Sequence, residues 1–227
     1  MIYIQILLFS LLTIGAYRIS RWLFFRYGYP LFNMVLFGTI LVMSVLLLFK
    51  IPYSVYEPAK NVMTILLGPA TVALAVPLYK NRVLLRQQGL IICGCVAAGS
   101  LVSMLLIIGF ARWGALNDLV MVSALPKSVT APIAIEIAQL SGGDPSLAVA
   151  FVVATGTFGG AMGPTLLRWL GIVHPEARGI ALGTVAHAQG VGMALLEGES
   201  AGAMASSAMA IAAIFTSFMA PVLLAMF

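Results

Sequence analysis

The sequence predicts an all-α, polytopic membrane protein with about seven or eight spans, broken helices and inverted repeats. Of its 227 residues, 62% are hydrophobic and only 8% are charged, and the mean hydropathy is +1.08. A soluble domain usually carries about 25% charged residues. A bilayer core of about 30 Å needs about 20 apolar residues per helix, and this requirement gives the expected number of spans for a chain of this length.

The candidate spans are eight apolar stretches: residues 2–16, 31–49, 62–79, 89–111, 115–140, 145–170, 178–196 and 202–227. Basic residues follow the first stretch rather than precede it. It therefore resembles a first span more than a cleaved signal peptide. The stretch 115–140 has a second interpretation, as a re-entrant hairpin.

Two clusters of basic residues follow the first and third candidate spans: Arg18, Arg21 and Arg26, then Lys80, Arg82 and Arg86. Cytoplasmic loops of membrane proteins carry an excess of Lys and Arg, so we expect both loops in the cytoplasm and the N-terminus outside. We assign the net charge of +5 to this bias and expect no nucleic-acid partner. Charges of the C-terminal half are mixed, which leaves the side of the C-terminus open.

A weak internal repeat is the basis for expecting two inverted halves. Gly68-Pro69 recurs as Gly163-Pro164, and Pro126 recurs as Pro221, both at a separation of 95 residues. If residues 115–140 cross the membrane once, the chain crosses the membrane three times within this separation. An odd number of crossings gives the second half the opposite orientation in the membrane.

Two charged residues, Lys127 and Glu136, lie inside a predicted span, in LPKSVTAPIAIEI (residues 125–137). A charge at mid-helix costs about 2.5–3.5 kcal/mol, so a membrane protein rarely keeps one that is neither paired nor facing a cavity. On one ideal helix the two residues would lie on opposite faces and could not pair.

Pro126 and Pro132 should break the helix, because proline has no backbone donor. Thr130 then becomes the N-cap of an outgoing half-helix with Pro132 in its first turn. Lys127, Ser128, Thr130 and the positive end of that half-helix would suit an anion such as a carboxylate. The alternative is an interfacial lysine that snorkels past a proline kink.

A second unusual stretch, TGTFGGAMGP (residues 155–164), contains two GxxxG spacings, Gly156 with Gly160 and Gly159 with Gly163. Such faces allow close helix packing. The alternative is a broken helix that exposes its backbone to substrate at Gly163-Pro164. Its counterpart TILLGPATVALAVP (residues 64–77) admits the same two interpretations.

The third stretch, GTVAHAQGVGMALL (residues 183–196), places His187 and Gln189 in a small-residue helix. A histidine there is either a packing partner or a group for proton coupling, since it titrates near neutral pH. Cys93 and Cys95 form a C-x-C pair whose thiols point to different helix faces. We expect no catalytic residues, no metal site and no cofactor.

At these stretches the sequence resembles the LrgB/CidB family of bacterial membrane proteins, whose relatives include the plastidial glycolate/glycerate transporter. The matching segments cover about residues 60–227 in consistent order: LLGPATVALAVPLY (66–79), LPKSVTAPIA (125–134), SGGDPSLAVAFVVATGTFGGAMGP (141–164) and ARGIALGTVAHAQG (177–190). We accordingly divide the chain into N-terminal transmembrane helices, 1–60, and an LrgB-like transport domain, 61–227.

The resemblance implies a multi-pass protein of the bacterial inner membrane, often encoded beside a smaller LrgA/CidA-like membrane protein, which is an expected partner together with a homo-oligomer. Two functions are attached to the family. One is transport of small carboxylates such as glycolate, glycerate or pyruvate, and the other is holin/antiholin-like control of murein hydrolase export and autolysis. We expect a secondary transporter, coupled to protons or another ion, and not an enzyme.

One departure from the family pattern affects the substrate. The family commonly continues after its histidine as H-A-x-G-T-A-R-A-x-E, and here the usual Thr, Arg and Glu are Val191, Met193 and Leu196. Glu197 comes one position late, about 100° around a helix, and is a poor substitute. If the family arginine holds a carboxylate, this protein binds a different substrate or relies on Lys127 alone. If arginine and glutamate only pair with each other, their joint loss could be nearly neutral.

The predicted substrate-binding residues are therefore Gly68, Pro69, Thr71, Lys127, Ser128, Thr130, Thr155, Gly156, Thr157, Gly163, Pro164, His187 and Gln189.

Overall fold

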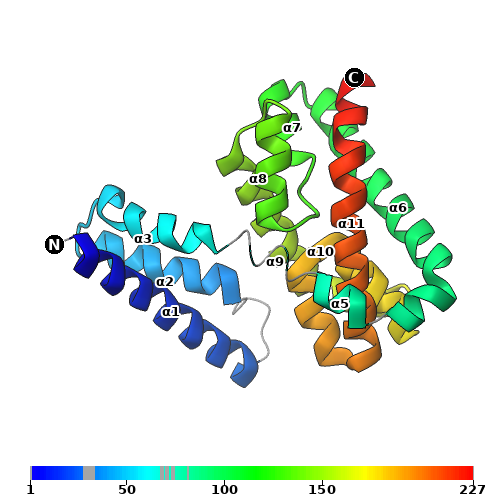
Figure 1. The fold of residues 1–227 in the computed structure, drawn as a ribbon, viewed down its shortest axis with the longest axis horizontal. Helices are drawn as coiled ribbons and strands as arrows, with labels where there is room; N and C mark the ends of the chain where they lie inside the picture. Colours follow the sequence, from blue (N-terminus) through cyan, green and yellow to red (C-terminus); the bar gives the residue numbers. More distant parts are fainter. Residues whose placement is uncertain are drawn as a thin grey trace. The chain divides into compact units, whose positions relative to one another are not determined.

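The computed structural model describes residues 2–27, 34–66, 69, 72, 75–80 and 82–226, and every regular element among them is a helix (Figure 1). The chain forms two compact units, Met1–Val72 and Ala73–Phe227. By length and composition alone, five described helices could cross a bilayer, a count that includes Pro175–Glu197, and Phe37–Leu48 and Ala131–Leu140 are shorter apolar helices. The all-α membrane fold is confirmed, whereas the expected seven or eight spans are not.

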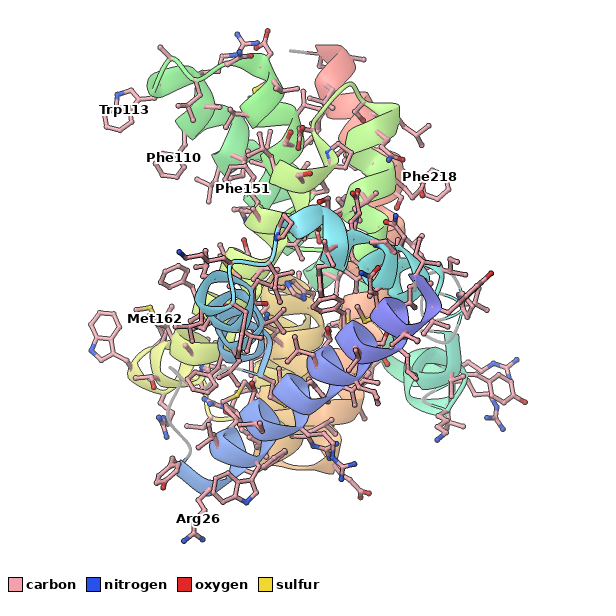
Figure 2. The ribbon with its side chains drawn as sticks, turned by 90° about the vertical axis from the view of Figure 1, so that its left-hand side faces the viewer. Arg26, Phe110, Trp113, Phe151, Met162 and Phe218 are labelled. Atoms are coloured by element: carbon pink, nitrogen blue, oxygen red, sulfur yellow. The ribbon has the colours of Figure 1, made fainter. Side chains whose placement is uncertain are left out.

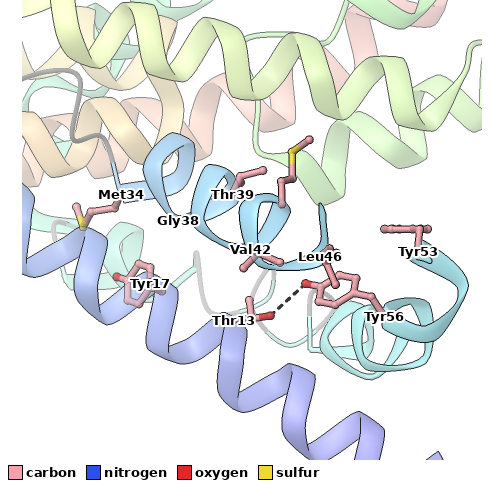
Figure 3. A pocket seen from close by; sticks show the side chains of 10 residues that line it. Thr13, Tyr17, Met34, Gly38, Thr39, Val42, Leu46, Tyr53 and Tyr56 are labelled. Atoms are coloured by element: carbon pink, nitrogen blue, oxygen red, sulfur yellow. Dashed lines mark hydrogen bonds between the residues drawn. The ribbon is translucent and has the colours of Figure 1, made fainter. Parts of the chain in front are cut away.

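The first unit contains α1 (Ile2–Tyr27), α2 (Met34–Leu48) and α3 (Tyr53–Ile65). Tyr56 of α3 makes two contacts with α1. The Tyr56 ring packs edge-on against Phe9, and the Tyr56 hydroxyl lies 3.1 Å from Thr13 Oγ1. Figure 3 shows this hydrogen bond beside a pocket of about 500 Å³ lined mainly by apolar side chains.

Two sequence predictions for this region are corrected. Helix α1 continues to Tyr27, so Arg18, Arg21 and Arg26 lie on a helix and not in a loop. Arginine is a good helix former, and glycine and proline follow only after Tyr27 in the sequence. The predicted span 62–79 is not one helix, because α3 ends at Ile65 and α5 covers Ala75–Lys80.

The second unit is built on α6 (Arg82–Trp113), α9 (Pro145–Trp169) and α11 (Glu199–Met226). Helices α6 and α11 pack along their length, through Ile92 and Val96 against Met204 near one end and through Met104 and Ile108 against Leu223 near the other. Figure 2 shows apolar side chains on the outside of this unit, including the largely exposed Phe110, Trp113 and Phe218. Large exposed apolar surface is typical of contact with lipid.

Residues 118–140 fold back on themselves as a hairpin of α7 (Asp118–Ala124) and α8 (Ala131–Leu140). Met121 and Leu125 share a core cluster with Ile137 of α8. After α8 the chain returns to α7, where the Asp144 amide donates to Ser123 Oγ at 2.8 Å. This arrangement agrees with the hairpin interpretation of 115–140.

Helix α10 (Pro175–Glu197) is also a hairpin, which corrects the prediction of a single straight span at 178–196. His187 has φ 41° and ψ −131°, and this conformation reverses the chain between a first arm (175–186) and a second arm (188–197). The arms pack so closely that a Cβ on Gly190 would lie 2.0 Å from the Leu182 carbonyl oxygen. Each arm of about ten residues spans about 15 Å, half of the hydrocarbon core.

The two hairpins lie at opposite ends of α6 and α11 (Figure 1). The α7–α8 hairpin packs on the ends of both helices, through Ala111 and Leu223. The α10 hairpin packs on the start of α11, where Leu182 and Ala194 meet Ala201. Within this unit, therefore, one hairpin enters from each end of the α6 and α11 pair.

The 95-residue inverted repeat is not confirmed. Pro126 lies in the turn between α7 and α8, whereas its proposed counterpart Pro221 lies inside the continuous helix α11. The counterpart of Gly163-Pro164 includes Gly68, which is outside the described residues.

Candidate functional site

The turn between α7 and α8, residues 125–130, carries the lysine of the candidate site. Its amides bond three residues back rather than four, from Lys127 to the Ala124 carbonyl and from Val129 to the Pro126 carbonyl. The predicted interruption of the helix by Pro126 is confirmed. The interruption places the lysine side chain on a turn and not on a helix face.

Lys127 is held by two hydroxyls. Its Nζ donates to Ser103 Oγ at 2.6 Å and to Ser128 Oγ at 3.2 Å, and the two hydroxyl oxygens are 3.2 Å apart. Both partners are neutral, so these contacts orient the ammonium without cancelling its charge. Among the described residues no carboxylate pairs with Lys127, so an approaching anion would meet its positive charge.

Thr130 is the N-cap of α8, with Pro132 in the first turn, as predicted. Its side chain does not cap the helix, and Thr130 Oγ1 is buried without a hydrogen-bond partner among the described residues. A buried hydroxyl left unpaired is unfavourable, so such a group commonly has a ligand or an ordered water as its partner.

His187 forms the turn of α10 and contacts α9. Its Nε2 lies 3.0 Å from the Val152 carbonyl oxygen. Since a carbonyl oxygen only accepts, Nε2 must carry the proton, and Nδ1 is left to accept a proton or a hydrogen bond. Gly156 makes room for the ring, because a Cβ there would lie 2.6 Å from two of its atoms.

Both turns meet the same part of α9. Val129 of the α7–α8 turn packs in one cluster with Val152, and the Val152 carbonyl oxygen is the partner of His187. The fold thus brings the turn at 125–130 and the turn at His187 to the same part of α9.

Two half-helices begin at this point, α8 after Thr130 and the second arm of α10 after His187. The first turn of a helix has free N–H groups and carries about half a positive charge. A helix also ends at each turn, α7 at Ala124 and the first arm of α10 before His187, and its C-terminal partial charge opposes that of the helix start. The net positive charge of the region therefore comes from the Lys127 ammonium. Broken helices that present their N-termini to an anionic group are a common feature of transporter sites.

The other predicted residues fall into three groups. Thr157 Oγ1 is buried without a partner among the described residues, and Thr155 and Gln189 are partly buried. Gly163 and Pro164 lie inside α9, which is continuous there, and contact Leu182 and Arg178 of α10. This favours the close-packing interpretation over a broken helix. In the third group, Gly68 and Thr71 are outside the described residues, and Pro69 is exposed.

Sequence reasoning missed three residues, Ser103 and the pair Arg178 and Glu197. Ser103 is one of two serines in α6, and nothing local marks it as the partner of a distant lysine. Arg178 and Glu197 join the ends of the two α10 arms, with Arg178 Nε 2.6 Å from Glu197 Oε2. Glu197 thus has a structural partner of its own. In the described residues no three His, Cys, Asp or Glu side chains are grouped so that they could hold a metal ion.

The chain was compared with known proteins. The model of the LrgB-like family matches residues 13–226, which includes most of the first unit. The chain is 39% identical over 217 residues to "Uncharacterized protein YxaC" of Bacillus subtilis (strain 168), covering 96% of this chain and 94% of that protein. It is 34% identical over 226 residues to "Holin-like protein CidB" of Staphylococcus aureus (strain N315), covering 99% and 98%. No solved structure matches the chain.

Proposed function

Since the chain belongs to the LrgB-like family of membrane proteins, we propose that it is a secondary transporter of a small organic anion, of the glycolate, glycerate or pyruvate class. The observation that carries this proposal is the Lys127 ammonium, which donates to the hydroxyls of Ser103 and Ser128 and has no carboxylate partner in the part of the chain that the structure describes, beside the starts of two half-helices.

The chemistry of the site fits a carboxylate. The ammonium supplies a donor and the positive charge, the N–H groups of two helix starts supply further donors, and the buried Thr130 hydroxyl supplies another. A hydrogen bond to a charged group contributes about 1.5–3 kcal/mol, so two or three of them suffice for micromolar to millimolar binding. His187 Nδ1 is the group that would couple transport to protons.

Location and orientation are part of the proposal. We place the protein in the bacterial cytoplasmic membrane, with the basic start of α6 (Arg82 and Arg86) in the cytoplasm and the N-terminus outside. Because α11 ends beside the end of α6, the C-terminus is then also outside. The α10 hairpin enters from the cytoplasmic side and the α7–α8 hairpin from the outer side.

A second candidate function is a holin-like or antiholin-like regulator of murein hydrolase export and autolysis, which acts by oligomerisation or with a smaller LrgA/CidA-like protein. The names of the Staphylococcus relatives favour this candidate more than they favour transport. A pore-forming subunit needs packing faces but no internal cation, and the retained Lys127 is the reason that transport remains our first proposal.

Uptake by purified protein in liposomes separates the two. A transporter gives saturable uptake of one labelled two- or three-carbon acid and retains an encapsulated fluorescent dye. A holin-like pore releases the dye and shows no saturation. Dye release at the rate of acid flux would overturn the transport proposal.

A further inference from the structure

A groove of about 510 Å³ runs between α6 and the first arm of α10. At one end it is lined by Gln88, in the second turn of α6, and by His174 and Glu176 at the start of α10. At the other end it is lined by Gly99 and Thr184. The polar end lies on the side of the unit that bears Arg82 and Arg86, and the deep end lies near the middle of α6.

Both walls of the groove continue into the candidate site. On α6 the groove residues and the partner of Lys127 recur every three or four positions and so share one helix face: Gln88, Ile92, Cys95, Gly99 and Ser103. Ser103 is one turn, about 6 Å, beyond Gly99. On α10, Thr184 is less than one turn before His187.

The deep end is closed by a helix contact. A Cβ on Gly99 would lie 3.4 Å from Thr184 Cγ2, which is ordinary van der Waals contact, so the backbone of α6 lies close to the Thr184 side chain. Glycine at this point leaves room for no more than a methyl group. The middle of the groove is lined by small and aliphatic side chains: Ile91, Ile92, Cys95, Ala177, Ile180, Ala181, Val185 and Met204.

We propose that this groove is the aqueous path by which the anion reaches Lys127 and His187 from the face that bears Arg82 and Arg86. The proposal rests on the transport function proposed above. Polar groups at its mouth favour water as the occupant, because a lipid acyl chain there would place the Gln88 amide and the Glu176 carboxylate against hydrocarbon. In this structure the groove is open to that face as far as the contact between Gly99 and Thr184, which has to loosen for an anion to pass.

The two cysteines of the chain allow a direct test. Both are exposed, but Cys95 lines the groove and Cys93, on another face of α6, is not among the lining residues. Cys93→Ser leaves Cys95 as the only thiol, and Cys95→Ser leaves Cys93 as the matched control. Each variant is treated with a charged, membrane-impermeant methanethiosulfonate in inside-out and right-side-out vesicles.

Thiols react as thiolates, which form readily only in contact with water, so a thiol in lipid should react about 100-fold more slowly. We expect rapid labelling of Cys95 from the face bearing Arg82 and Arg86, and slow labelling of Cys93 from either face. N-ethylmaleimide, which enters membranes, should reach both. Labelling of Cys95 by N-ethylmaleimide but not by the charged reagent would show a lipid-filled groove and overturn the proposal.

A second pair of variants links the path to transport. Gly99→Leu should fill the deep end and lower uptake at least about tenfold, because overpacking a tight contact is unfavourable, while Cys95, nearer the mouth, stays reactive. Gly94→Leu is the control, since a Cβ on Gly94 meets nothing within 4 Å. Equal uptake by the Gly99→Leu and Gly94→Leu proteins would overturn the proposal that the anion passes through this groove. Reactive Cys95 in a protein that transports no anion would instead overturn the proposed function.

Discussion

Arg178 and Glu197 are 19 residues apart in the sequence, yet Arg178 Nη2 lies 2.5 Å from Glu197 Oε1 and the two form a bidentate ion pair. Arg178 also donates to the Ile172 carbonyl at 2.8 Å and to the Pro164 carbonyl at 3.1 Å. One guanidinium therefore joins both arms of the α10 hairpin to the end of α9. These contacts fix the open end of the α10 hairpin and thereby position the His187 turn at its tip.

Removal of Arg178 should destabilise the protein strongly. Arg178→Met leaves the Glu197 carboxylate and two carbonyl groups without their donor, and breaking a buried ion pair costs about 3–5 kcal/mol. Because the Glu197 side chain is 23% exposed, we expect a loss near the lower end of that range. Thermal unfolding in detergent measures it.

The double variant Arg178→Met/Glu197→Met is the control for the uncompensated charge. It should be more stable than Arg178→Met alone, because the second substitution removes the unpaired carboxylate. A double variant less stable than the single one would show that the ion pair is not the reason for the loss.

Close packing of α10 on α11 should depend on Gly183. A Cβ there would lie 2.1 Å from the Ala205 carbonyl oxygen, so Gly183→Ala must force two backbones apart. We expect a loss of about 1–3 kcal/mol. Gly192→Ala is the matched control, since a Cβ on Gly192 meets nothing within 4 Å, and it should leave the unfolding temperature unchanged or slightly raised. Equal effects of the two substitutions would contradict the packing.

The sequence predicted local breaks better than it predicted distant contacts. Pro126 and Pro132 have a fixed local effect on the backbone, so the interrupted helix and the N-cap at Thr130 were correctly placed. The turn at His187 was missed because a histidine at positive φ has no local sequence signal and is stabilised by contacts with α9. The partnership of Lys127 with Ser103 was also missed, because it depends on how α6 packs against a turn 24 residues away.

Proton coupling is expected to depend on His187. His187→Gln keeps a donor for the Val152 carbonyl oxygen but removes Nδ1, the ring nitrogen that can accept a proton. An imposed proton gradient should then no longer accelerate uptake, while counterflow exchange remains measurable. An unchanged response to the gradient would leave His187 with only its packing role.

The orientation of the second unit predicts the side of the C-terminus. Ala111, near the end of α6, shares a core cluster with Leu223, near the end of α11, so both helices end on the same side. With Arg82 in the cytoplasm, a reporter fused after Phe227 should be active only if that reporter functions outside the cytoplasm. Activity of a cytoplasmic reporter at this position would contradict the assigned orientation.

The most direct test of the account is the uptake of labelled two- and three-carbon acids by liposomes that contain the wild-type, Lys127→Met or Lys127→Arg protein. Methionine keeps the length of the side chain without its charge, and arginine keeps the charge in a different shape. Loss of a charge-assisted hydrogen bond should weaken apparent affinity about 10- to 100-fold in Lys127→Met, with part of the activity retained in Lys127→Arg. Uptake by a well-folded Lys127→Met protein at the wild-type rate and apparent affinity would contradict an anion site at Lys127.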